Sequence, residues 1–367
     1  MLVRPLLVLL LSVLLFTASS ASAKKIEIVL INPGFETNNS TGDFWLNVSH
    51  FAQAAAKDLD IGLTVKYAQR NHIEMLNIAK AVSQSRPNAI IVVNEKKAGV
   101  KMVKEIAKHN VPIFLLLNPL SKAELATLTK KERSLIIGSI EPDNYLAGYK
   151  LMHSLAAIQA DKLKNEFNQQ NTRKNNKINA VALLGDHVTK ASIERKLGMD
   201  KALQELGHIQ LLDASPGNWS EEVAFNKLSG LSKRSIIDIV WAANDPMAFG
   251  AQRALKQNNK HQIASVGGIN WDLPQDGATI DISYGGHVIL GGFAVVMVHD
   301  LLKNNQLNPT RKLDIFVSNK ESYANTFQTL MLNKKFDEID FTQFSNMHVQ
   351  PKNFSILSII ESSQLTH

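Results

Sequence analysis

The chain contains no cysteine among its 367 residues. This absence excludes disulfide bonds, cysteine-ligated metal centres and thiol nucleophiles. It also excludes the lipid-modified cysteine that tethers many exported bacterial proteins. A chain of this length must therefore be stabilised by its hydrophobic core alone, and 45% hydrophobic with 20% charged residues is the composition of an ordinary globular protein.

Long apolar runs are also rare, and the clearest one lies at the N-terminus. Arg4 precedes an apolar run over 6–16, and Ala21-Ser22-Ala23 follows it. This is the pattern of a secretory signal peptide, and the run is shorter than the roughly 20 residues that span a bilayer. We therefore expect residues 1–23 to be a signal peptide cleaved after Ala23, rather than an uncleaved membrane anchor.

The excess positive charge is not concentrated in one segment of the sequence. The formal net charge is +7 and the sequence pI about 9.3. The densest basic stretch, 162–177, is mixed with Asn and Gln and reads as an exposed loop. It lacks the interleaved aromatic residues with which proteins stack single-stranded nucleic acid. We do not expect a nucleic-acid partner.

Short apolar runs alternate with segments of helical periodicity, which predicts parallel sheets with right-handed crossovers. In the first half we expect strands over 26–31, 63–67, 89–93 and 111–117. The pattern restarts near residue 135, with strands expected over 135–139, 178–184, 208–214, 236–243, 263–267 and 278–283. The fold class predicted is α/β, with two doubly wound parallel-sheet lobes. A buried helix is expected over 288–302, and an irregular, aromatic-rich tail after Phe316 is expected to wrap over the second lobe.

Polar residues follow several of these strands, where open α/β sheets bind ligands. The run 238–255 is the clearest case, because a buried strand ends at Asn244-Asp245-Pro246 and a helix follows. Asn or Asp before a first-turn Pro is also a plain helix cap. A ligand contact and a simple cap are therefore both open for Asn244 and Asp245.

Three of the four tryptophans fall in loops of this kind, namely Trp45, Trp219 and Trp271. Aromatic faces cover the C–H faces of a sugar ring, while amide, carboxylate and guanidinium groups bond its hydroxyls. A site built this way discriminates strongly, because a wrong ligand leaves buried polar groups unpaired. The loops therefore predict a small polyhydroxylated ligand in a cleft between the lobes.

The segments 191–199, 241–255 and 265–270 make the chain resemble the periplasmic sugar-binding proteins of the ribose/galactose type. These are type I periplasmic binding proteins, related to autoinducer-binding receptors. The resemblance implies two lobes joined by a three-strand hinge, with crossovers near 139–143, 282–284 and 316–319. The N-terminal lobe would comprise 24–140 plus 285–316, and the C-terminal lobe 141–284 plus 317–367 with the tail.

The same resemblance implies ligand contacts. Arg195 would reach the ligand from the second lobe, Trp219 would stack on it, and Asn244 would bond a hydroxyl. Two departures argue against ribose itself, because Asn118-Pro119 and Asn270 stand where ribose binders carry charged residues. The full expected ligand-binding set is Asn32, Phe44, Trp45, Asn118, Arg195, Trp219, Asn244, Asn270, Trp271 and Tyr284.

The function expected from these observations is capture of a sugar-like ligand in the periplasm and its presentation to the permease of an ABC transporter. We expect a monomer with no cofactor, no metal and no catalysis. The alternative is a receptor for a membrane sensor kinase or another signalling partner. A secreted glycosidase is a third reading, because it would need a pair of carboxylates, for which Glu141, Asp143, Asp186 with His187, and Asp272 are candidates.

Overall fold

The computed structural model describes residues 25–37, 41–167, 177–260, 264–272, 279–303 and 309–363. The expected signal peptide lies outside the described residues. Within the described ranges, no helix combines the length and the apolar character needed to cross a membrane.

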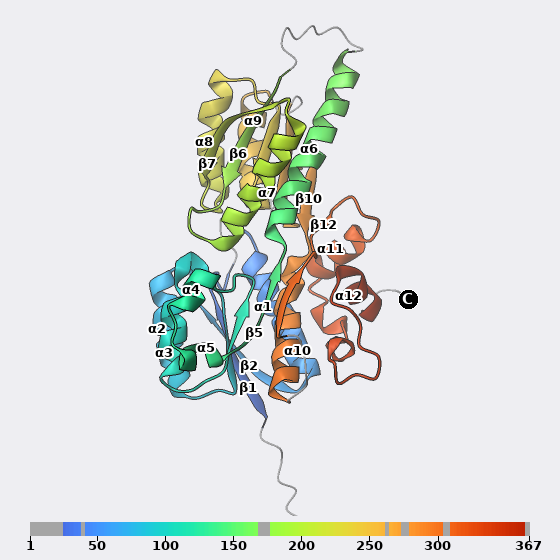
Figure 1. Cartoon of the computed structure of the whole chain (residues 1–367). Coiled ribbons are helices and arrows are strands. Elements are labelled where there is room, and N and C mark those ends of the chain that lie inside the picture. Colours follow the sequence, from blue (N-terminus) through green and yellow to red (C-terminus); the bar gives the residue numbers. More distant parts are fainter. Residues whose placement is uncertain are drawn as a thin grey trace, which may run out of the picture.

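The chain forms two lobes, each built on a six-stranded sheet (Figure 1). The first sheet has the order β11-β5-β4-β3-β1-β2 and is parallel throughout. Its strands are β1 (Ile26–Asn32), β2 (Ile61–Tyr67), β3 (Ala89–Val92), β4 (Ile113–Leu116), β5 (Ile136–Pro142) and β11 (Thr310–Leu313).

The second sheet repeats this order as β12-β10-β9-β8-β6-β7, with β12 antiparallel to β10. Its strands are β6 (Ile178–Leu184), β7 (Ile209–Pro216), β8 (Ile239–Ala242), β9 (Ser265–Asn270), β10 (Ile282–Gly285) and β12 (Val317–Ser318). The predicted α/β class with two doubly wound lobes is confirmed. The strand expected over 278–283 is displaced to β10, and β11 is a strand that the sequence pattern did not predict.

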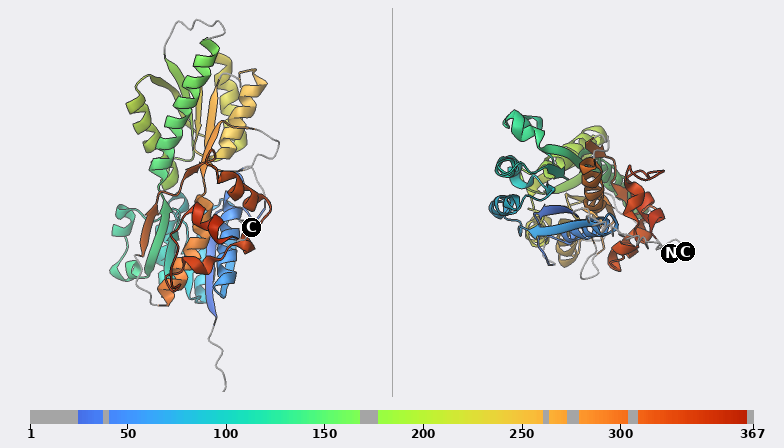
Figure 2. Two further views of the ribbon diagram at one scale, coloured as in Figure 1. Left: turned by 90° about the vertical axis from the view of Figure 1, so that its right-hand side faces the viewer. Right: turned by 90° about the horizontal axis from the view of Figure 1, so that it is seen from below.

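Helices cover both faces of each sheet (Figures 1 and 2). In the first lobe α1 and α10 pack together on one face, and α2 and α3 on the other. In the second lobe α6 packs on α7, and α8 on α9. The helices are α1 (Phe44–Asp58), α2 (His72–Gln84), α3 (Gly99–Ala107), α4 (Lys122–Ala126), α5 (Lys130–Ser134), α6 (Asn144–Phe167), α7 (Lys190–Leu206), α8 (Glu221–Arg234), α9 (Asp245–Gln257) and α10 (Leu290–Leu302).

Two glycines bring α6 and α7 into close contact beside the gap between the lobes. A Cβ atom on Gly148 would lie 2.0 Å from the backbone oxygen of Arg195, and one on Gly198 would lie 1.9 Å from that of Tyr145. Neither distance is possible for a real side chain, so both positions require glycine. This packing fixes the first turns of α7, which carry Arg195, against the start of α6.

The chain passes between the lobes at the three expected crossovers, so the predicted three-strand hinge is confirmed. β5 leads into α6, β10 leads into the short 3-10 helix η2 (His287–Ile289), and β11 leads into β12. Ion pairs tie the crossovers together, with Lys312 3.3 Å from Asp143 and Lys150 2.9 Å from Asp314. After β12 the chain crosses a fourth time, because the tail returns to the first lobe.

The expectation that the tail wraps over the second lobe is wrong. Apart from β12, its buried side chains join the core of the first lobe. They pack on α1 and α10, where Phe327 stacks on Phe51 at 6.0 Å and Phe354 stacks on Phe293 at 4.2 Å. The tail is also not irregular, since it forms α11 (Ala324–Leu332), η3 (Phe336–Glu338), η4 (Phe341–Phe344) and α12 (Ile356–Ser362).

The physical reason lies in α10, where every residue over 290–298 is buried. A helix that is apolar all round needs cover on every side. The sheet covers one side of α10, and the tail covers another (Figure 1).

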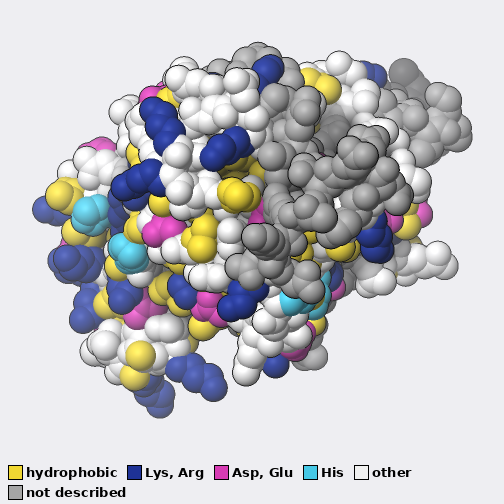
Figure 3. All heavy atoms as spheres, turned by 90° about the horizontal axis from the view of Figure 1, so that it is seen from above, with side chains coloured by type: hydrophobic (Ala, Val, Ile, Leu, Met, Phe, Trp, Pro, Cys, Tyr) yellow, Lys and Arg dark blue, Asp and Glu magenta, His cyan; other side chains and the backbone are white. Residues whose placement is uncertain are grey.

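The surface seen from above mixes charges of both signs (Figure 3). Lys and Arg side chains are interspersed there with Asp, Glu, His and uncharged residues.

Candidate functional site

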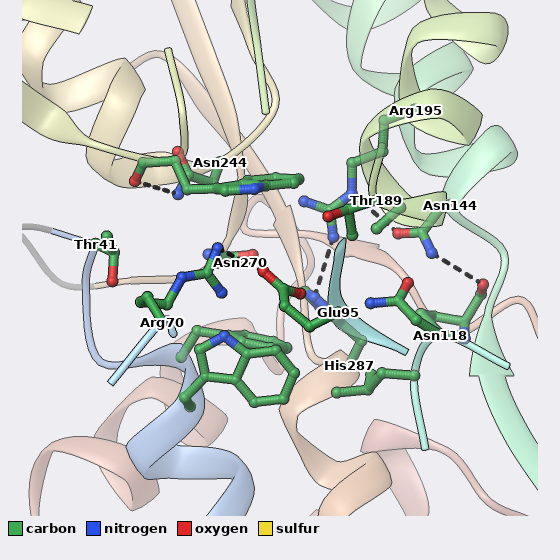
Figure 4. Close-up of a pocket in the computed structure, with 16 residues that line it drawn as sticks. Thr41, Arg70, Glu95, Asn118, Asn144, Thr189, Arg195, Asn244, Asn270 and His287 are labelled. Atoms are coloured by element: carbon green, nitrogen blue, oxygen red, sulfur yellow. Dashed lines mark hydrogen bonds and ion pairs between the residues drawn. The ribbon is translucent and has the colours of Figure 1, made fainter. Parts of the chain in front are cut away.

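A cavity lies between the lobes and is lined by residues of both. Its position follows from the topology. In each sheet the strand order reverses beside the first strand, between β1 and β3 and between β6 and β8, and loops at such switch points form ligand crevices. The cavity is lined by Thr41, Phe44, Trp45, Arg70, Glu95, Leu117, Asn118, Pro142, Asn144, Thr189, Ala191, Arg195, Trp219, Asn244, Asn270 and His287 (Figure 4).

Arg195 is the central cation of the second-lobe wall. Its side chain is buried and donates from Nε to Asn144 Oδ1 at 2.9 Å and from Nη1 to the backbone oxygen of Ala243. Burial lowers the pKa of Arg195 to about 9, against the attraction of Asp245 and Asp272. The guanidinium therefore stays charged at neutral pH and is held in one orientation.

His287 meets Arg195 from the other side of the cavity. Nε2 of His287 lies 3.2 Å from Nη2 of Arg195 (Figure 4). Burial and the neighbouring guanidinium lower the pKa of His287 well below its usual value. The imidazole is therefore neutral, and because Arg195 can only donate, Nε2 accepts and Nδ1 carries the proton.

The Trp219 loop is built by hydrogen bonds to its neighbours. Asn218 and Trp219 both have positive φ, at 54° and 64°. Trp219 Nε1 donates to Asp186 Oδ2 at 3.0 Å, and Asn244 Nδ2 donates to the Trp219 backbone oxygen at 3.0 Å. Asn244 also caps α9, accepting from the backbone of Met247 at 3.1 Å. Asn244 therefore both caps the helix and lines the cavity.

The first-lobe wall is aromatic at the start of α1. The rings of Phe44 and Trp45 meet edge to face at 5.1 Å, and Phe44 lies 4.6 Å from the His287 ring. A Cβ on Gly34 would lie 2.2 Å from Trp45 Cβ, so only glycine lets the preceding loop pass. Trp45 from one lobe and Trp219 from the other thus contribute the two indole rings of the cavity.

A buried ion pair completes the first-lobe wall. Arg70 follows β2 and Glu95 follows β3, and Arg70 Nη2 lies 2.9 Å from Glu95 Oε1 (Figure 4). Only 2% of the Glu95 side chain is exposed. Burial raises the pKa of Glu95, and the charge of Arg70 opposes that rise.

Three buried atoms on the cavity-lining residues have no hydrogen-bond partner among the described residues. They are Glu95 Oε1, Asn118 Oδ1 and His287 Nδ1. Buried polar atoms in folded proteins are nearly always hydrogen-bonded, to the protein or to something bound. Asn118 Oδ1, an acceptor, and His287 Nδ1, a donor, therefore have no partner among the described residues, and Glu95 Oε1 has only its ion pair with Arg70.

Seven of the ten residues expected in the site line this cavity, and three do not. Asn32 is buried beneath it, where Nδ2 donates to the Trp45 backbone oxygen and to Ser49 Oγ. Trp271 turns into the first-lobe core against Phe327 and donates from Nε1 to the Ser283 backbone oxygen.

Tyr284 packs against the second-lobe core, and its hydroxyl lies 2.9 Å from Ser154 Oγ. The side chains of Asn32, Trp271 and Tyr284 therefore hold the walls together rather than face the cavity.

Nine lining residues lie outside the expected ligand-binding set, and for one of them, His287, the sequence leaves a ligand contact open. Arg70 and Glu95 each follow a predicted strand, so position alone could have singled them out, but a charged residue in such a place is usually solvated. The others are Thr41, Leu117, Pro142, Asn144, Thr189, Ala191 and His287.

The carboxylates considered for acid–base catalysis have structural partners. Asp186 accepts from the backbones of Val188 and Thr189 at the start of α7. Glu141 pairs with Lys190, and Asp143 accepts from the Leu146 backbone.

Asp272 accepts from Asn270 Nδ2 at 2.9 Å, and its backbone donates to Asp245 Oδ2 at 2.9 Å. Burial raises the pKa of Asp245 to about 7 and holds that of Asp272 well above its usual value. Among the residues that the structure describes, no three His, Cys, Asp or Glu side chains are grouped to hold a metal ion.

A cavity between two doubly wound lobes, walled by residues of both, defines a two-lobe ligand-binding protein. The chain belongs to the periplasmic binding protein family, whose domain model matches residues 34–278. The type I periplasmic binding protein fold implied by the sequence is thereby confirmed.

The chain is similar to a periplasmic sugar-binding protein of Pseudomonas fluorescens. The two are 27% identical, with a TM-score of 0.76 over 91% of this chain and 99% of the other. A periplasmic solute-binding protein of an ABC transporter from Actinobacillus succinogenes, solved with D-allose, shares the fold at 20% identity. Its TM-score is 0.69, over 82% of this chain and all of the other.

Among curated proteins, the chain is similar to a xylitol-binding protein of Mycolicibacterium smegmatis, at 27% identity over 205 residues. That match covers 55% of this chain and about half, 54%, of the relative.

Proposed function

We infer that the protein captures a neutral, polyhydroxylated molecule, a sugar or sugar alcohol, between its lobes. The observation that carries this function is a trio of buried atoms that lack a hydrogen bond among the described residues, Glu95 Oε1, Asn118 Oδ1 and His287 Nδ1, all on residues that line the cavity. Hydroxyl groups both donate and accept, so a polyol suits acceptors and donors alike. The indoles of Trp45 and Trp219 supply apolar faces for its C–H groups.

The charges of the site favour a neutral ligand. Arg70 is paired with Glu95, so it is not an uncompensated cation that would draw in an anion. The guanidinium of Arg195 is occupied by Asn144, the Ala243 backbone oxygen and His287. The names of the two relatives at 27% identity, one a sugar-binding and the other a xylitol-binding protein, support the same ligand class.

The role proposed is that of a periplasmic solute-binding protein that presents its ligand to a membrane permease. Family membership and the N-terminal export pattern support this role. In this role the lobes close around the ligand, and the protein binds it without catalysing a reaction.

Thermal shift followed by isothermal titration calorimetry tests the ligand class, using pentoses, hexoses and the matching alditols. A ligand at a hundred times its Kd should stabilise the protein by about 2.7 kcal/mol. If no neutral polyol shifts the melting temperature, the proposed ligand class is wrong. Co-purification with membrane proteins then distinguishes a permease from a sensor kinase.

A further inference from the structure

We propose that the Arg70–Glu95 ion pair is the specificity determinant of the cavity, with Glu95 accepting from ligand hydroxyls and rejecting negatively charged analogues. This inference rests on the proposed function and names the residues that select within its ligand class. Both side chains line the cavity, and neither belongs to the set expected from the sequence.

The Glu95 carboxylate is buried and held by its ion pair with Arg70. Its side chain is 2% exposed and Arg70 is 16% exposed, so the pair is shielded from bulk water. Oε1 lies 2.9 Å from Arg70 Nη2 yet has no hydrogen-bond partner among the described residues. The ion pair therefore leaves Oε1 without a hydrogen-bond donor among the described residues, on a side chain that lines the cavity.

The backbone beside each partner is in a conformation that non-glycine residues rarely adopt. Gln69 and Arg70 have φ of 51° and 60°, and Lys96 and Lys97 have φ of 46° and 61°. Such conformations cost free energy and persist where the surrounding structure enforces them, typically at functional sites. Hydrogen bonds enforce the first pair, because the backbones of Gln69 and Arg70 donate to Gly34 and Pro33.

The chemistry of the pair decides what it selects. A buried carboxylate accepts hydrogen bonds and donates none, so its partner must carry a proton. A sugar or alditol hydroxyl meets this demand, whereas a carboxylate or phosphate group at the same place is repelled. Arg70, already neutralised by Glu95, orients the carboxylate and donates its remaining N–H groups to hydroxyl oxygens.

The test compares wild type with Glu95→Gln, which keeps the shape of the side chain and removes its charge. With the best neutral ligand from the screen, we expect Glu95→Gln to weaken binding roughly tenfold to a hundredfold, the range for hydrogen bonds to a charged group. Glu105→Gln is the matched control, because Glu105 forms a surface ion pair with Lys108 in the same lobe and does not line the cavity.

A deoxy series then separates recognition from a merely structural role. Each ligand hydroxyl is removed in turn, and binding of every analogue to wild type and to Glu95→Gln is measured. If Glu95 accepts a hydrogen bond from one ligand hydroxyl, removal of that hydroxyl should weaken binding strongly in wild type and only slightly in Glu95→Gln. The uronic acid of the same sugar should bind wild type poorly. In Glu95→Gln, the affinity for the uronic acid should rise relative to the affinity for the neutral ligand.

The double variant Arg70→Gln/Glu95→Gln guards against misfolding, since it leaves no buried charge unpaired. If wild type binds a neutral polyol and Glu95→Gln binds it equally well, the proposal for this pair is wrong while the proposed function stands. If the loss is the same for every deoxy analogue, the pair is structural and the proposal also fails. If wild type binds no polyol, it is the proposed function that fails.

Discussion

The guanidinium of Arg195, on α7 of the second lobe, lies 3.2 Å from Nε2 of His287, which follows β10 on the first-lobe side of the cavity. This contact joins the lobes directly at the cavity wall. It requires a neutral His287, and the lowered pKa of that ring satisfies the requirement. The same guanidinium bonds Asn144, at the start of α6. One side chain thus connects both lobes and a crossover.

Replacing Arg195 by Lys should weaken ligand binding roughly tenfold to a hundredfold. A lysine ammonium is a single point of donation and cannot bond Asn144, Ala243 and His287 together. Calorimetric titration with the best ligand measures the loss. The matched control is Arg253→Lys, because Arg253 pairs with Glu221 and Glu222 on the surface of the same lobe. Equal affinities of the two variants would contradict a role for Arg195 in the site.

Trp219→Ala should reduce affinity by a similar factor, because an indole face buried against the ligand contributes about 1.5–3 kcal/mol. Trp219→Phe keeps a ring but loses the hydrogen bond from Nε1 to Asp186, so we expect an intermediate affinity. Leu212→Ala, at a partly exposed position on β7, serves as the control. Binding that survives Trp219→Ala unchanged would remove Trp219 from the site.

Much of this site could be predicted from the sequence, because the carboxyl ends of parallel strands meet at one edge. Arg195, Trp219 and Asn244 all follow second-lobe strands, and all line the cavity. Arg70 and Glu95 occupy equivalent places in the first lobe. The burial of their side chains is a tertiary property that no local pattern encodes.

Trp271, which was also expected to contact the ligand, does not line the cavity. It follows β9 as expected, but its backbone φ of 64° turns the ring towards Phe327 of the tail. The return of the tail to the first lobe is a long-range event, since its aromatic residues could have covered either lobe. The two-lobe architecture was predictable from strand and helix periodicity, whereas the partner of the tail depended on which helices remained uncovered.

Asp245 should make stability depend on pH. Its pKa is raised by burial to about 7 in the folded protein, from an ordinary value of 3.8. The folded state then binds a proton that the unfolded state has lost. The resulting stabilisation is complete below the unfolded pKa and disappears as the pH rises through about 7.

Asp245→Asn tests this dependence in an Asp272→Asn background, because Asp245 raises the pKa of Asp272 and its replacement would otherwise change how Asp272 titrates. The free energy of unfolding of Asp272→Asn, relative to the double variant, should fall by on the order of 1 kcal/mol between pH 6 and pH 8. Urea denaturation at several pH values measures the difference. A difference that is constant with pH would show that Asp245 titrates in its ordinary range.

The tail should stabilise the first lobe through its buried aromatic residues. Phe341 is fully buried, and its ring occupies the space that a Cβ on Gly292 of α10 would enter. Phe341→Ala should therefore lower the free energy of unfolding by about 3–5 kcal/mol. Leu332→Ala, in the same tail but 60% exposed, should change it by less than about 0.5 kcal/mol.

Because Phe341 does not line the cavity, Phe341→Ala should bind ligand with unchanged affinity wherever the protein remains folded. Denaturation curves and calorimetric titration of the two variants provide both measurements. If Phe341→Ala were no more costly than Leu332→Ala, the tail would not be part of the first-lobe core, and α10 would have to be stable with one apolar side uncovered.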